Sequence, residues 1–154
     1  MKTIVLGVGN PILGDDGVGL HILKEAKEKI KRPDITFSEA YTGGMNLLDL
    51  IMNHDRALLI DAVKMKDKKP GEIAFFDLKN MSSFHSHNPH DVTLPEAIKL
   101  ARHLGDKRIP DDIKLLGINL DKTPTEFSEE LSPEISKIIP KAVDMIKKEV
   151  ESDD

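Results

Sequence analysis

Near the start of the chain stands the stretch Gly7-Val8-Gly9-Asn10-Pro11-Ile12-Leu13-Gly14-Asp15-Asp16-Gly17-Val18-Gly19. It follows the strand-like run Lys2–Leu6 and precedes the helix-like segment Leu20–Ile30. A glycine-rich turn from a strand into a helix is a common place to bind phosphate. This turn instead carries two adjacent carboxylates, which repel phosphate and attract cations. The stretch therefore predicts a strand–turn–helix unit built for a metal ion or a proton rather than a nucleotide.

The rest of the chain alternates between strand-like and helix-like segments. Apolar runs predict strands at Thr3–Val8, Ile35–Ala40, Ala57–Ala62, Ile73–Phe76 and Ile113–Asn119. Helical spacing predicts helices at Leu20–Ile30, at Met45–Met52, from Thr93 to about Leu104, and from Ser132 onward with a kink at Pro140.

The short connection before Ile73–Phe76 sets the direction of that strand. Only about ten residues separate it from the preceding strand, too few for a parallel crossover, so we expect an antiparallel edge strand. The alternation as a whole predicts an α/β three-layer sandwich with a twisted, five-stranded, mostly parallel sheet and helices on both faces.

Composition bounds the class of protein. The 154 residues suit one domain, residues 1–154, with a net charge of −5 and no cysteine. Disulfides, thiolate metal sites and cysteine nucleophiles are thereby excluded. Five Phe, one Tyr and no basic stripe disfavour nucleic-acid binding. The sequence shows no signal peptide and no apolar run of membrane-spanning length, so we expect a cytoplasmic protein with no membrane partner.

Three carboxylates are candidates for the chemistry. Asp15 and Asp16 begin the first helix, where either one alone would serve as a cap, but one cap needs only one side chain. Asp61 follows the apolar run Ala57–Ile60 at the end of its strand, where its structural role would be to hydrogen-bond the adjacent loop. Ligands of open α/β sheets bind at the carboxyl ends of strands, and the first and third strands are expected to be neighbours. Asp16 and Asp61 are therefore expected at one rim.

Histidines supply a further candidate ligand. His85, His87 and His90 fall in a polar loop just before a predicted helix, and His90 is nearest to the helix start. His85 and His87 are either spectators or additional weak ligands. The remaining histidines, His21, His54 and His103, fall in helical stretches and are interpreted as structural. Two carboxylates and one imidazole suit a divalent metal with open positions, such as nickel or zinc, and not a closed structural zinc site.

Other nucleotide and hydrolase signatures are weak or missing. Gly7-x-Gly9 is only part of a dinucleotide-binding fingerprint, because no GxGxxG is present. The chain has no GxxxxGK[ST], no HExxH and no GxSxG.

In its motifs the chain resembles the hydrogenase maturation endopeptidases, from residue 1 to about residue 150. The matching stretches are, in chain order, Val5-Leu6-Gly7-Val8-Gly9-Asn10, Asp15-Asp16, Gly17-Val18-Gly19, Thr42-Gly43-Gly44-Met45-Asn46-Leu47-Leu48, Leu59-Ile60-Asp61-Ala62-Val63, Pro70-Gly71-Glu72, Pro89-His90-Asp91 followed by Leu94, and Leu115-Leu116-Gly117-Ile118. Two places depart from the family's pattern: Glu39-Ala40-Tyr41 stands where an Asp-Gly pair is usual, and Asn119-Leu120 where the last strand usually ends in Gln-Pro.

The resemblance implies an activity and a site. It implies a monomeric endopeptidase that removes the C-terminal extension of a nickel-iron hydrogenase large-subunit precursor after nickel insertion. It implies Asp16, Asp61 and His90 as catalytic-site metal ligands. The sequence position of Asp15 permits a role either as a general base or as a group that supports a ligand. The nickel would come with the substrate, and zinc or cadmium would also suit the site. The competing hypothesis is a non-catalytic, metal-binding maturation chaperone of the same fold.

Overall fold

The computed structural model describes residues 1–41, 45–78, 94–122 and 124–152. The elements, in chain order, are β1 (Thr3–Val8), the 3-10 turn η1 (Gly14–Gly17), α1 (Val18–Lys29), β2 (Ile35–Ala40), α2 (Met45–Ile51), β3 (Arg56–Val63), β4 (Ile73–Asp77), α3 (Leu94–His103), β5 (Asp112–Asn119), α4 (Pro133–Ser136) and α5 (Ile139–Glu151).

The strands form one twisted five-stranded sheet in the order β2-β1-β3-β5-β4. All neighbouring strands run parallel except β4, which pairs antiparallel with β5 at the edge. Every residue of β1 and β3 is buried, as expected for apolar strands covered on both faces. The predicted α/β fold, its strands and the antiparallel edge strand are confirmed.

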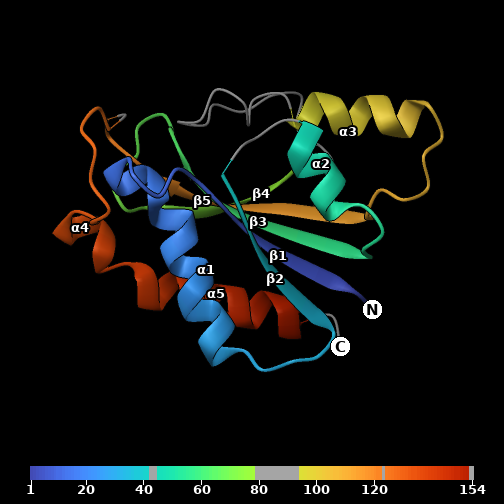
Figure 1. Ribbon diagram of the computed structural model, residues 1–154, viewed down its shortest axis with the longest axis horizontal. Helices are drawn as coiled ribbons and strands as arrows, with labels where there is room; N and C mark the ends of the chain where they lie inside the picture. Colours follow the sequence, from blue (N-terminus) through green and yellow to red (C-terminus); the bar gives the residue numbers. More distant parts are fainter. Residues whose placement is uncertain (42–44, 79–93, 123, 153–154) are drawn as a thin grey trace.

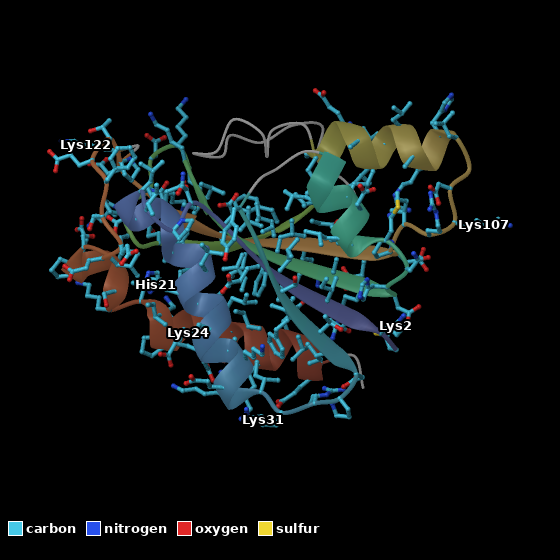
Figure 2. All side chains as sticks on the ribbon, in the orientation of Figure 1. Lys2, His21, Lys24, Lys31, Lys107 and Lys122 are labelled. Carbon is cyan, nitrogen blue, oxygen red and sulfur yellow. The ribbon has the colours of Figure 1, made fainter. Side chains whose placement is uncertain are left out.

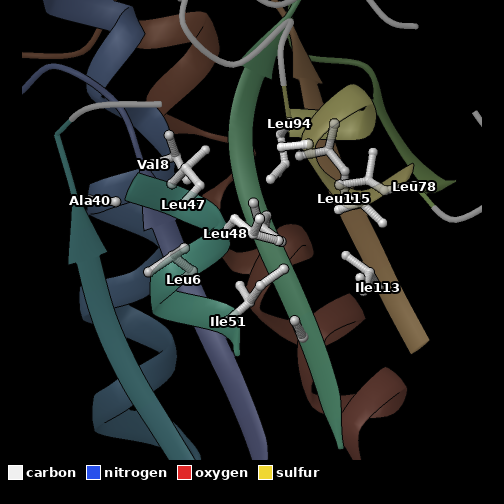
Figure 3. Packing of buried hydrophobic residues seen from close by; sticks show 14 of the residues in the cluster. Leu6, Val8, Ala40, Leu47, Leu48, Ile51, Leu78, Leu94, Ile113 and Leu115 are labelled. Carbon is white, nitrogen blue, oxygen red and sulfur yellow. The ribbon is translucent and has the colours of Figure 1, made fainter. Parts of the chain in front are cut away.

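Two helix pairs cover the sheet, one on each face (Figure 1). Helices α1 and α5 pack against alternate strand residues that include Leu58, Ile60 and Ala62. Helices α2 and α3 pack on the other face, against a cluster that includes Leu59 and Val63. Figure 3 labels Leu48 and Ile51 of α2 and Leu94 of α3 in this cluster. Because side chains alternate along a strand, Asp61 shares the α2/α3 face with Leu59 and Val63.

The C-terminal helical segment differs from the prediction of one kinked helix. Two separate helices, α4 and α5, are joined through Lys137 and Ile138. Pro140 lies in the first turn of α5, where its missing N–H leaves no intrahelical hydrogen bond unmade. The proline therefore begins a helix instead of bending one.

His54 lies in the turn after α2 and not in a helix, and its Nδ1 is 2.9 Å from the carbonyl oxygen of Met52. The predicted start of the third helix at Thr93 falls outside the described residues, and the helix is described from Leu94. Across the described ranges, no helix is both long and apolar enough to span a bilayer.

Candidate functional site

Asp16 is buried at the carboxyl end of β1. It lies in η1 with only 5% of its surface exposed. Its Oδ2 accepts a hydrogen bond from the Asn10 backbone N–H at 2.9 Å, and its own N–H donates to the Leu13 carbonyl oxygen at 3.0 Å. These bonds hold the carboxylate inside the turn.

Two glycines permit this close folding of the turn. A Cβ at Gly9 would lie 2.3 Å from the carbonyl oxygen of Asp16, and a Cβ at Gly19 would lie 2.3 Å from the carbonyl oxygen of Ile60. Only glycine tolerates such approaches of backbone to backbone. Gly19 thus brings the start of α1 against the end of β3.

Asp61 lies at that end of β3, immediately after Ile60. Only 2% of it is exposed, and its Oδ1 accepts a hydrogen bond from the Ala62 backbone N–H at 2.8 Å. β1 and β3 are parallel neighbours, so their carboxyl ends meet at one rim, and η1 lies against β3. The structure brings Asp16 and Asp61 to the same rim of the sheet.

Two buried carboxylates at one rim limit the chemistry of the site. Burial of an ionised carboxylate is costly unless a cation, a shared proton or hydrogen-bond donors offset it. Oxygen ligands of this kind suit hard and borderline divalent metals. The donor set is therefore compatible with a divalent metal ion at the rim.

Asp15, unlike Asp16, hydrogen-bonds to a residue in the C-terminal part of the chain. Its Oδ1 accepts a hydrogen bond from the Ser132 N–H at 2.7 Å, and its Oδ2 accepts one from the Ser132 hydroxyl at 2.8 Å. Ser132 precedes α4, so Asp15 ties the turn to the C-terminal helices. The Ser132-Pro133 pair signals a helix start in the sequence, but nothing in the sequence pairs it with Asp15.

The predicted histidine ligand lies outside the described residues, as do His85 and His87. His90 precedes α3 by four residues, and Leu94, the first residue of α3, is fully buried on the α2/α3 face, which is the face of Asp61. Over the described ranges 1–41, 45–78, 94–122 and 124–152, no three His, Asp or Glu side chains gather as metal ligands.

Asn119, one of the two departures from the family pattern, is a buried side chain that hydrogen-bonds the backbone of a neighbouring turn. Nothing in the sequence indicated these hydrogen bonds. Asn119 is 2% exposed at the end of β5. Its Oδ1 accepts from the Met65 N–H at 2.7 Å, and its Nδ2 donates to the carbonyl oxygens of Lys68 and Lys69, each at 3.0 Å. The side chain therefore fastens the turn 64–69, which follows β3, to the end of β5.

The other departure is at the end of β2, on the same rim. The exposed Tyr41 hydroxyl donates a hydrogen bond to the Glu39 carboxylate. That bond, together with the nearby negative charge, raises the pKa of Tyr41 above its ordinary value.

Solved structures with the same fold share about a quarter of their residues with this chain. The hydrogenase maturating endopeptidase HybD from Escherichia coli is 26% identical, with 95% of this chain and 90% of that chain covered and a TM-score of 0.76. The [NiFe] hydrogenase maturation protease HybD from Thermococcus kodakarensis is 26% identical, with coverage of 96% and 98% and a TM-score of 0.69.

Sequence comparison points the same way. The coenzyme F420 hydrogenase subunit delta of Methanothermobacter thermautotrophicus is 28% identical, with 97% of this chain and 94% of the relative covered. The family model for hydrogenase maturation proteases matches residues 3–149. The chain belongs to the hydrogenase maturation protease family.

Proposed function

We propose that this chain is an endopeptidase that removes the C-terminal extension of a nickel-iron hydrogenase large-subunit precursor after nickel has been inserted. The observation that carries the proposal is the pair of buried carboxylates, Asp16 and Asp61, at one rim of the sheet in a chain of this family. The Thermococcus kodakarensis relative is a [NiFe] hydrogenase maturation protease, which supports nickel as the metal of the substrate.

The metal ligands in this proposal are Asp16, Asp61 and His90. Two carboxylates and one imidazole leave coordination positions open, so the set is suited to a nickel ion already held by the precursor. Zinc or cadmium would suit the same ligands. Binding then reports that the precursor is loaded, because the three side chains complete the coordination of the substrate's own metal.

Hydrolysis requires a water molecule near the rim. The water oxygen adds to the scissile carbonyl carbon, the C–N bond breaks, and both protons of the water end on the leaving amine as the carboxylate product forms. A buried carboxylate at this rim can accept the first proton. Asp15 is proposed as a positioning residue rather than the base, because both of its oxygens accept hydrogen bonds from Ser132.

The test compares nickel-loaded with nickel-free precursor and reads the mass of the precursor's C-terminus. We expect the extension to be lost only from the loaded form. Asp16→Asn keeps the size of the side chain and removes its charge. We expect cleavage to slow by more than about 100-fold, because replacing even a residue that only hydrogen-bonds a metal ligand lowers metal affinity or activity by about 10- to 100-fold. Asp15→Asn is the matched control, and we expect it to slow cleavage less than Asp16→Asn does.

Two results would contradict these assignments. Equal cleavage of loaded and nickel-free precursor would remove the role of the metal in recognition. Full activity of Asp16→Asn would remove Asp16 from the ligand set while leaving the protease activity intact.

A second candidate is a non-catalytic, metal-binding maturation chaperone. The relative from Methanothermobacter thermautotrophicus favours it, because that protein is named as a subunit of a hydrogenase and not as a protease. This candidate predicts binding of the loaded precursor with no change in its mass. In both candidates we place the chain in the cytoplasm as a monomer, which cell fractionation and sedimentation test.

A further inference from the structure

An open hollow of about 290 Å³ lies beside the site, at the carboxyl end of β3. Its walls are mostly apolar, and its lining comes from β3, the turn 64–69 and β4. The lining residues are Val63, Lys64, Met65, Lys66, Lys68, Ala74 and Phe76. None of them belongs to the carboxylate pair described above.

Strand register places this hollow next to Asp61. Asp61 pairs with Gly117 of β5, and Gly117 pairs with Ala74 of β4, so the three residues form one row across the sheet. Neighbouring strands lie about 4.8 Å apart, which puts the backbone of Ala74 about 10 Å from that of Asp61. Asp61 and the hollow also share the α2/α3 face, because Val63 and Phe76 belong to that cluster.

Gly117 shapes the floor between them. A Cβ at this position would lie 2.8 Å from Cγ2 of Val63 and 3.0 Å from Cε2 of Phe76. Because Gly117 has no side chain, Val63 and Phe76 can approach each other above it. For the same reason no side chain stands between Asp61 and Ala74 on this face of the sheet.

The rim of the hollow is positive although the chain as a whole is negative. Lys64, Lys66 and Lys68 are exposed residues and belong to the lining of the hollow, while the net charge of the chain is −5. A ligand that places an apolar side chain on the floor and a carboxylate at the rim would complement both features.

We propose that this hollow is a subsite for the substrate polypeptide, and this inference rests on the proposed protease function. The subsite takes an apolar side chain about three residues from the scissile bond, since an extended chain covers about 10 Å in three residues. An acidic residue next to that side chain lies against the lysines at the rim. The occupant is thus an extended peptide segment with an apolar and an acidic residue side by side.

The test measures binding by fluorescence anisotropy on the full chain, separately from cleavage. The probe is a short labelled peptide with leucine next to glutamate, compared with peptides in which serine replaces the leucine or lysine replaces the glutamate. We expect the unaltered peptide to bind best. Lys66→Glu with Lys68→Glu should weaken its binding about three- to tenfold, as expected for reversal of two exposed charge pairs.

A matched control carries the same change of charge elsewhere. Lys24→Glu with Lys31→Glu alters exposed residues beside α1, on the opposite face of the sheet (Figure 2). At about 0.15 M salt, charges farther apart than about 8 Å are largely screened, so binding should change by less than about twofold. An equal loss in the control would show general electrostatic attraction and would overturn the subsite.

A third variant tests the apolar floor. Ala74→Phe fills the hollow and should abolish the preference for leucine over serine, while thermal unfolding shows whether the variant is folded. If the serine peptide binds the wild-type chain as well as the leucine peptide, the subsite is refuted. If sedimentation instead shows a dimer that Ala74→Phe dissociates, the hollow is a self-association surface and the proposal is wrong.

Failure of the subsite and failure of the proposed function give different results. Peptide preference without cleavage of the precursor supports the subsite and contradicts the protease. Cleavage of the loaded precursor without any peptide preference supports the protease and contradicts the subsite.

Discussion

Replacing Asn119 tests whether one buried side chain holds the turn 64–69 against the end of β5. The Met65 N–H can only donate, and the carbonyl oxygens of Lys68 and Lys69 can only accept, so the orientation of the amide is set by its partners. Asn119→Ala removes all of these hydrogen bonds. Asn119→Asp keeps an acceptor for Met65 but turns a carboxylate oxygen toward both carbonyl oxygens.

The magnitude follows from the bonds lost. A hydrogen bond within a protein contributes about 1 kcal/mol net, so Asn119→Ala should lower the free energy of unfolding by about 3 kcal/mol. For a chain of this size that corresponds to a fall in Tm of about 6–12 °C. At neutral pH, Asn119→Asp should cost at least as much, because it adds a buried charge next to two like partial charges.

The pH dependence of Asn119→Asp has a definite sign. The surroundings disfavour the ionised form, so the pKa of the introduced carboxyl is higher in the folded chain than its unfolded value of about 3.9. The protonated acid can still donate one hydrogen bond. The loss of stability relative to wild type should therefore be smallest below about pH 4 and grow as the pH rises through the folded pKa.

Urea unfolding followed by far-ultraviolet circular dichroism measures both variants against the wild type across this pH range. The reasoning is refuted if Asn119→Ala changes the free energy of unfolding by less than about 0.5 kcal/mol, the ordinary range of neutral surface substitutions. It is also refuted if the deficit of Asn119→Asp does not change with pH. Either result would mean that other contacts hold the turn.

Two further predictions concern the rim. Gly19→Ala places a Cβ 2.3 Å from the carbonyl oxygen of Ile60 and should destabilise the chain by about 3 kcal/mol in urea unfolding. A Cβ at Gly105 would have no atom within 4 Å, but the residue has a φ of +78°, so Gly105→Ala should lower the free energy of unfolding by about 1 kcal/mol. Equal losses of stability in the two variants would contradict the argument from crowding at Gly19. Tyr41 is the only tyrosine, so phenolate absorbance reports its titration directly. The measured pKa of Tyr41 should lie above 10.0 and should fall toward that value in Glu39→Ala. A pKa of 10.0 in the wild-type chain would exclude the hydrogen bond.

Most of the fold is predictable because its signals are local. Apolar runs mark β1 and β3, and the connection before β4 is too short for a parallel crossover. The carboxylate rim follows from the same logic, since parallel neighbours end at one edge. The predicted kink at Pro140 is wrong because a proline is compatible with either a kink or a first helical turn, and the choice depends on how α4 and α5 pack.

Contacts between distant parts of the chain left no such signal. Asp15 and Ser132 lie 117 residues apart in sequence, and Asn119 bonds Met65 across 54 residues. A side chain able to hydrogen-bond has many possible partners, and only the packed fold selects one. The role of Asp15 was open in the sequence for this reason, and the hollow beside Asp61 had no counterpart there.

The sequence by itself determined the order of strands and helices, the carboxylates at the strand ends and the family resemblance, because each depends on residues close together in the chain. The tertiary structure decided which groups face one another: α2 and α3 cover the sheet face that carries Asp61, Asp15 bonds to Ser132, and Gly117 opens the row toward β4. Strand register and helix packing decide these relations, and both arise from contacts that form only when the chain is folded.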